Sequence, residues 1–181
     1  MIRIPGYFIT WITFPGVIVH EFAHALFCRL FGVKIYGIVY FRLTTSSKEL
    51  AGYVAHERTD KAWKQVLISI GPLFVNTIIG AVIAAPAAIP VLRFQGGDAL
   101  DYFLIWLGVS ICMHSFPSIL DAKAIWNRLR SGNCPILTRV IGTPIVGLMY
   151  VGALGSMMCL DLLYGAAVAG FLPNLLVQIL A

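Results

Sequence analysis

Long apolar segments separated by short polar ones dominate this sequence. Residues 4–31 carry formal charges only at Glu21 and Arg29, and residues 65–92 carry none. Both segments exceed the roughly 20 apolar residues that a helix needs to cross the hydrocarbon core of a bilayer. They predict the first two transmembrane helices, and residues 102–120 predict a third.

The C-terminal segment, residues 140–181, has a single formal charge, at Asp161. One straight helix of this length would extend about 60 Å, roughly twice the hydrocarbon thickness. Two arrangements fit the pattern: two spans that turn near residues 161–165, or one span followed by an interfacial tail broken at Pro173. The chain therefore contains four or five predicted transmembrane helices.

A change of period follows the first span. Apolar and polar residues alternate over residues 33–43, which is the two-residue period of a β-strand. Residues 44–47 read Thr-Thr-Ser-Ser and predict a turn, and residues 50–56 predict the returning strand. The expected fold is an all-α polytopic membrane protein with a short β-hairpin after the first span. A chain of this length usually forms one domain, so we expect residues 1–181 to form a single membrane-embedded domain.

Composition and charge placement support a membrane protein and indicate its orientation. Hydrophobic residues make up 59% of the chain and charged residues 12%, whereas soluble domains carry about 25% charged residues. The net charge is +5, and every lysine and arginine except Arg3 and Arg93 lies in or beside the loops after the first and third spans. By the positive-inside rule these loops are cytoplasmic and the N-terminus is outside. We therefore expect a multi-pass protein of the cell membrane whose basic loops meet the lipid bilayer, with no nucleic-acid partner.

The first span contains the pattern His20-Glu21-x-x-His24. Residues four apart lie on one face of a helix, so both imidazoles can bind a single zinc ion while Glu21 acts as a general base beside it. Glu21 is also the only formal charge between Arg3 and Arg29. An ionisable residue at that depth is costly unless it has a function or a partner. The motif therefore predicts a site for one Zn²⁺ ion.

A catalytic zinc ion takes three protein ligands and leaves one position for water. Asp121 is the preferred third ligand, because the predicted orientation places it in the cytoplasmic half of the bilayer, as it does the motif. His114 is the alternative, although on a continuous helix it lies two turns, about 10 Å, from Asp121. Cys28, one turn after the motif, and His56, in the returning strand, are further alternatives.

Two more motifs accompany the His-Glu-x-x-His helix. Gly71-Pro72 is followed by Asn76, and residues 116–121 read Phe-Pro-Ser-Ile-Leu-Asp. Together with residues 19–25 and their Phe-Gly-Val exit, they resemble the site-2 protease family of intramembrane zinc metalloproteases. Asn76 lies one residue later than in the family pattern, and alanine replaces the glycine after the aspartate. The chain would be a minimal core of this family, without an appended soluble domain.

The resemblance implies hydrolysis of a peptide bond within or near a substrate's transmembrane segment. It implies three zinc ligands: His20, His24 and Asp121. Glu21 would be the general base, and Asn76 would contact the oxyanion or the unwound substrate. The substrate would be a transmembrane protein, and a regulatory membrane partner or homo-oligomerisation would help to select it.

Two other functions fit the same residues. A catalytically inactive metal-binding scaffold or regulator of the same fold fits the departures in the second and third motifs. A membrane hydrolase acting on a non-peptide bond fits the metal motif equally well. The presence of Glu21 favours hydrolysis over a scaffold, because simple metal binding needs no base at that position.

Overall fold

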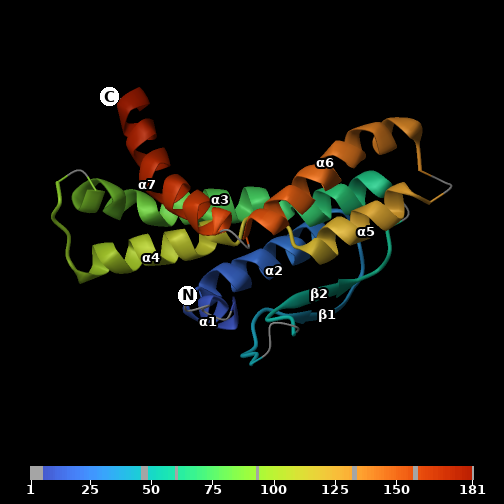
Figure 1. The fold of residues 1–181 in the computed structure, drawn as a ribbon, viewed down its shortest axis with the longest axis horizontal. Helices are drawn as coiled ribbons and strands as arrows, with labels where there is room; N and C mark the ends of the chain where they lie inside the picture. Colours follow the sequence, from blue (N-terminus) through green and yellow to red (C-terminus); the bar gives the residue numbers. More distant parts are fainter. Residues whose placement is uncertain are drawn as a thin grey trace.

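The structure is a computed structural model that describes residues 6–45, 49–59, 61–92, 94–131, 134–156 and 159–180. It is mostly helical, with one two-stranded antiparallel sheet. Figure 1 shows the long helix α3 running through most of the molecule, and α2, α4, α5, α6 and α7 all contact it. In chain order the elements are α1 (Gly6–Ile12), α2 (Phe14–Leu30), β1 (Ile35–Val39), β2 (Tyr53–His56), α3 (Ala62–Leu92), α4 (Ala99–Met113), α5 (Ile119–Leu129), α6 (Ile136–Gly155) and α7 (Leu160–Leu180).

The first predicted span is divided into two helices that meet at Thr13. Pro15 lacks the N–H that would bond to the carbonyl of Trp11 in a continuous helix, so the ladder is interrupted there. The sequence predicts a single span kinked at Pro15, and the structure has a break between two helices at this place. Helix α2, with 17 residues, carries the metal motif by itself.

The predicted hairpin is confirmed. Strands β1 and β2 pair antiparallel, and the pairing extends toward the turn, where Arg42 N donates to Ala51 O at 2.7 Å. The predicted turn includes Ser46 and Ser47, which lie outside the described residues. Both strands contact α2, and Figure 1 shows the hairpin beside that helix. The hairpin is thus a neighbour of the metal motif.

Small residues bring α3 and α4 into close contact. A Cβ atom on Gly108 would lie 2.6 Å from the carbonyl oxygen of Gly80 and 2.7 Å from Cβ of Ala84. Side chains at these glycines would push the helices apart, whereas small residues let two helix backbones approach closely. The glycine and alanine residues of the second predicted span therefore serve helix packing.

The third predicted span is not one helix, because α4 and α5 are separated by irregular residues 114–118. Pro117 has no N–H to continue the helical ladder. Ser118 then begins α5 with a capping box that it forms with Asp121. The prediction that a continuous helix places His114 two turns from Asp121 was wrong, because the helix is interrupted between them.

Helix α5 packs one face against α3 and α6. Ala122 and Ile125 are fully buried, in a cluster with Val66 of α3 and Val146 of α6. Burying an aliphatic side chain of this size stabilises the fold by about 1.5–3 kcal/mol relative to leaving it exposed. This packing holds in place the first turn of α5, which carries Asp121.

The C-terminal segment forms two helices, and the boundary between them, at residues 156–159, lies before the predicted turn near residues 161–165. Helix α6 ends at Gly155 and α7 begins at Leu160, with Cys159 between them in the left-handed region at φ 61°. Helix α7 continues through Pro173 and contacts both α3 and α4.

Two helices within the described residues, α3 and α6, are long and apolar enough to cross a membrane. Helix α4 and residues Leu160–Pro173 of α7 are apolar but shorter. The sequence predicts four or five spans, and fewer of the described helices are long enough to cross a bilayer. The reason is that the first and third predicted spans are broken, at Thr13 and at residues 114–118.

Candidate metal centre

Helix α2 presents His20 and His24 one turn apart, with their Nε2 atoms 3.1 Å from each other. Gly16, one turn before His20, lets α2 approach α4 closely. A Cβ atom at Gly16 would lie 2.0 Å from the carbonyl oxygen of Ser110 and 2.5 Å from Nδ1 of His114. Any other residue there would displace one of the two helices. Glycine at this position therefore lets α2 hold its two histidines close to α3 and α4.

His24 is anchored by α3. Its Nδ1 lies 2.9 Å from the carbonyl oxygen of Ile68. In a regular helix that oxygen accepts a bond from the N–H of the residue four positions later, but this residue is Pro72, which has no N–H. Pro72 therefore leaves the Ile68 carbonyl available to the histidine.

His20 has a corresponding anchor at the end of α4. Its Nδ1 lies 2.7 Å from the carbonyl oxygen of His114. In a continuous helix that oxygen would pair with the N–H of Ser118, but α4 ends at Met113 and this N–H donates to Oδ2 of Asp121. Nδ2 of Asn76 donates to the His114 carbonyl oxygen at 3.2 Å. Each metal-motif histidine is thus held by a carbonyl that has no helical partner.

The two anchors determine where the ring protons lie. A carbonyl oxygen only accepts hydrogen bonds, so Nδ1 of both His20 and His24 carries the proton and each Nε2 has a lone pair. Two lone pairs 3.1 Å apart in a buried site repel each other unless a proton or a metal ion lies between them. Two nitrogen ligands at about 2.0–2.1 Å from a tetrahedral zinc ion are roughly 3.4 Å apart. The pair therefore fits zinc.

Asp121 completes the group. Its Oδ1 lies 3.5 Å from Nε2 of His24, and the ligand atoms of His20, His24 and Asp121 all lie within 4.8 Å of one another. Its Oδ2 accepts hydrogen bonds from N and Oγ of Ser118 at 2.8 and 2.6 Å. The capping box thus aims one carboxylate oxygen at the histidines. These three residues could hold a metal ion, and three is the number of protein ligands in catalytic zinc sites.

Glu21 lies beside this group under the hairpin. Only 8% of it is exposed, and its carboxylate is close enough to His24 and Asp121 to interact electrostatically with both. Gly52, just before β2, covers it: a Cβ atom there would lie 2.7 Å from Cγ and 3.1 Å from Oε1 of Glu21. A carboxylate beside the ligands, in a site shielded from solvent, can serve as a general base.

Residues 13–130 match the family DUF3267, which is described as "Putative zincin peptidase". The chain belongs to this family. The matched range runs from α2 through α5 and contains every residue of the site above. Membership implies a zinc-dependent metallopeptidase, in agreement with the predicted zinc ion. No curated protein and no solved structure matches the chain.

In this zincin-family chain, Asn76 joins three helices. It is completely buried, and its Nδ2 lies 3.2 Å from each of the carbonyl oxygens of Gly16, Ile111 and His114. Its Oδ1 has no hydrogen-bond partner among the described residues. The sequence predicts that Asn76 contacts an oxyanion or the substrate, whereas in this structure its amide nitrogen is bonded to the main chain of α2 and α4.

The alternative ligands considered from the sequence lie outside the group formed by His20, His24 and Asp121. His114 contributes its carbonyl to the site, while its Nδ1 lies 3.0 Å from the carbonyl oxygen of Ser110. Cys28 is fully buried, and Nδ1 of His56 bonds to the carbonyl of the next residue. Within the described residues, the third member of the metal-binding group is Asp121.

Three residues of the site were not singled out in the sequence: Gly16, Gly52 and Ser118. A signal existed for Ser118, since Ser-x-x-Asp before an apolar run is a capping-box pattern. Gly16 lies one turn before His20, on the same helical face. Nothing local marks Gly52, because its contact with Glu21 joins the hairpin to α2.

Proposed function

We propose that this zincin-family protein is an intramembrane zinc peptidase of the site-2 protease type. It hydrolyses a peptide bond within or near a transmembrane segment of its substrate, which is itself a membrane protein. The observation that carries the proposal is the pair of Nε2 atoms that face each other at 3.1 Å, beside Asp121, within a cluster of apolar helices. A metal ion there would accept both Nε2 lone pairs, and the carboxylate of Glu21 lies within electrostatic reach of the ligands.

Each residue of the group has a defined role in this proposal. His20, His24 and Asp121 would hold the zinc ion, which when bound would supply a Lewis acid for the scissile carbonyl and the attacking water. Glu21 accepts the proton that the attacking water releases and passes it to the leaving amine. Its shielded position favours this transfer, because a carboxylate removed from bulk water binds a proton more readily.

Asn76 acts as a positioning residue in this scheme. It holds the carbonyl of His114, and this carbonyl in turn holds the ring of His20. Partners of this kind, behind the metal ligands, orient the ligands and tune the metal. The oxyanion contact predicted from the sequence would require the amide of Asn76 to give up one of its three carbonyls.

Exposed apolar side chains support a location in a bilayer. On α6, Leu148 and Val151 are 72% and 63% exposed, and on α3, Ile78 and Val82 are 62% and 67% exposed. In water each such side chain forgoes about 1.5–3 kcal/mol of burial free energy, so the core helix of a soluble protein covers them. Lipid removes this cost, and α3 and α6 are long enough to cross it.

A substrate helix must unwind before its scissile carbonyl can reach the site, because helical carbonyls are hydrogen-bonded internally. The hairpin lies against α2, with Gly52 directly over Glu21. An extended peptide can add to the edge of such a sheet through main-chain hydrogen bonds. The hairpin would then hold the unwound segment beside the general base.

Reconstitution with and without zinc tests the proposed function. The purified protein in lipid nanodiscs is stripped with a chelator and reloaded with zinc. It is then given one peptide in two forms, as a membrane-embedded helix and as a soluble extended segment. We expect zinc-dependent cleavage of the embedded form, detected by mass spectrometry of the new N-terminus. Cleavage of the soluble form alone would support a metallopeptidase function and refute cleavage within the membrane.

Single cysteines test the proposed orientation, with the N-terminus outside and the metal site in the cytoplasmic half of the bilayer. In a background without the native cysteines, Ser131→Cys should react with an impermeant thiol reagent only after permeabilisation, because basic loops remain inside. Ala99→Cys, at the start of α4, should react in intact cells. Ala99 is exposed and is preferred to Gly97, where a Cβ atom would lie 2.7 Å from Val91. Reaction of Ser131→Cys in intact cells would reverse the orientation.

A further inference from the structure

A cavity of about 660 Å³ lies between α3, α5 and the segment that follows β2. Among the described side chains that line it, three are cationic, Arg58, Lys123 and Arg128, and none is acidic. Its other walls are largely polar and include Gln65 and Asn127. The cavity therefore has the size and charge to receive an anionic group.

Two of the cations are available to a ligand. The side chains of Arg58 and Lys123 form no hydrogen bond or ion pair within the described part of the chain, and both residues are exposed. Arg128 instead has a structural role, because its Nε donates to the carbonyl of Thr59 at 3.1 Å and joins α5 to the opposite wall. Glu57 lines a smaller adjoining hollow, which shares Arg58 and Thr59 with the cavity.

The elements that line the cavity also build the metal centre. Leu120, in its lining, directly precedes Asp121 on α5. Gln65, in the α3 wall, lies one turn before Ile68, whose carbonyl anchors His24. The third wall begins at His56, the last residue of β2. This strand directly follows Gly52, which covers Glu21. A peptide held at the metal centre has this cavity beside it.

We propose that this cavity binds acidic side chains of the substrate next to the bond that is cut. The proposal rests on the peptidase function proposed above and specifies its substrate class: membrane proteins with Asp or Glu close to the cleaved segment. Arg58 and Lys123 pair with these carboxylates. Charge-assisted hydrogen bonds of this kind are about twice as strong as neutral ones.

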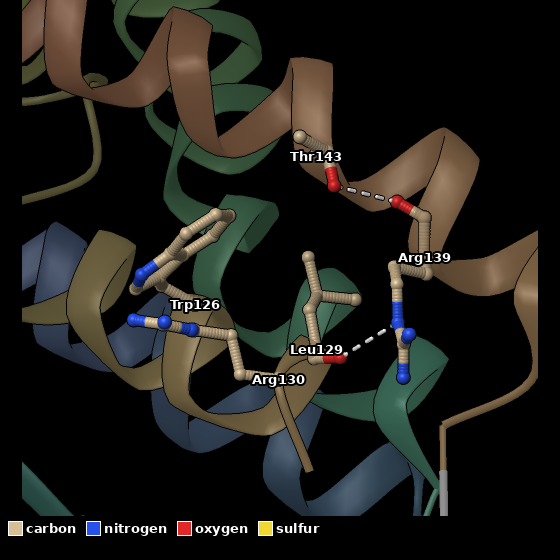
Figure 2. A pocket seen from close by; sticks show the side chains of 5 residues that line it. All are labelled: Trp126, Leu129, Arg130, Arg139 and Thr143. Carbon is tan, nitrogen blue, oxygen red and sulfur yellow. Dashed lines mark hydrogen bonds between the residues drawn. The ribbon is translucent and has the colours of Figure 1, made fainter. Parts of the chain in front are cut away.

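A second basic pocket, of about 240 Å³, lies on α5 and α6. Figure 2 shows it, with the guanidinium of Arg130 over the ring of Trp126, 5.5 Å from its centroid. Arg139 donates from Nε to the carbonyl of Leu129 at 3.1 Å. Three residues before Arg139 on α6, Ile136 is 79% exposed. The described lining of the larger cavity has only Leu120 and Ala124 as apolar side chains, so it offers little surface to an acyl chain, which favours a peptide ligand there.

Binding of matched peptides tests the proposal. The probe is a fluorescent peptide with an apolar half and a half rich in Asp and Glu, and its partner has Asn and Gln in their places. Both are titrated against zinc-loaded Glu21→Gln protein in phosphatidylcholine nanodiscs, by fluorescence anisotropy. We expect the acidic peptide to bind more tightly. The double variant Arg58→Gln/Lys123→Gln should weaken its binding about 10–100-fold while changing that of the amide peptide less than about twofold.

The control variant is Arg29→Gln/Arg130→Gln, which removes the same number of charges outside the cavity. It should leave the preference for the acidic peptide intact. Equal weakening by the two double variants would mean that only overall charge matters, and the proposal would be overturned. It would also be overturned if both peptides bound alike, or if phosphatidylglycerol in the nanodiscs displaced the acidic peptide from wild type but not from Arg58→Gln/Lys123→Gln.

The same titration separates this proposal from the peptidase function, because binding to Glu21→Gln protein requires no cleavage. If the preference for the acidic peptide depends on Arg58 and Lys123 while wild type cuts neither peptide, the cavity is supported and the peptidase function is not. If wild type cuts both peptides at equal rates and binds them equally, the peptidase stands and the acidic substrate class is rejected.

Discussion

Replacing Glu21 by Gln is expected to lower peptide hydrolysis about 10²–10⁴-fold, which is the usual contribution of a general base. The amide is nearly isosteric but cannot accept the proton that the attacking water releases. Zinc content should be unchanged, because Glu21 is not a member of the ligand group formed by His20, His24 and Asp121. Folding should also be retained, since the change removes a charge from a site that is only 8% exposed. Zinc content and cleavage of the membrane-embedded peptide are measured on the same sample.

The matched control is Glu49→Gln, which removes an exposed carboxylate from the hairpin loop. It should keep both zinc and activity. A Glu21→Gln protein that carries zinc and performs its cellular role normally would refute the peptidase. The protein would then be a metal-binding scaffold of the same fold.

Replacing Asp121 by Ala is expected to remove zinc from the purified protein, with an affinity loss of more than about 100-fold. Removing a partner behind a ligand already costs about 10–100-fold, and Asp121 itself is in the ligand group. His114→Ala should keep the metal, since His114 serves the site through its main-chain carbonyl, which alanine retains. Zinc affinity is measured by competition with a chromogenic chelator.

The capping role of Asp121 calls for a second variant. Ser118→Ala removes the hydroxyl that bonds to Oδ2 but leaves the carboxylate in place. Its helix should lose about 1 kcal/mol of stability, with only a partial loss of zinc affinity. Zinc lost equally in Ser118→Ala and Asp121→Ala would show that the order of α5, rather than a metal bond, was measured. Zinc retained in Asp121→Ala and lost in His114→Ala would exclude Asp121 as the third ligand.

Variants of residues that position the two histidines should lose more zinc affinity than His114→Ala and less than Asp121→Ala. Asn76→Ala removes the amide that holds the His114 carbonyl, and Pro72→Ala supplies an N–H that competes with His24 for the Ile68 carbonyl. Each is expected to lower zinc affinity about 10–100-fold. No change in either variant would mean that the two carbonyl anchors do not tune the site.

The helix that carries the metal motif was predictable because its geometry is local. His20 and His24 are one turn apart in any α-helix, and an isolated charge at Glu21 within an apolar run signals function. Alternation over residues 33–43 predicted the hairpin for a similar reason, since strand period is a property of neighbouring residues. Asp121 was predicted from depth in the membrane, and in the structure it lies in one group with the histidines.

The break between α4 and α5 was not predicted, although Pro117 was visible. Proline alone does not end an apolar helix, because neighbouring helices can satisfy the main-chain groups that it frees. Here the break persists because Asn76 and His20 bond to the His114 carbonyl. Both partners come from other helices, so they cannot be predicted from the sequence of this segment alone.

The sequence by itself determined the apolar segments, the hairpin and the chemical types of the ligands, all of which depend on residues within a few positions of one another. Only the tertiary structure decided which carbonyls anchor the two histidines, across 94 and 44 residues of sequence. It also decided that Gly52 covers Glu21. The physical reason is that covalent geometry sets local periodicity, whereas the meeting of distant segments depends on close packing, here at Gly16, Gly80 and Gly108.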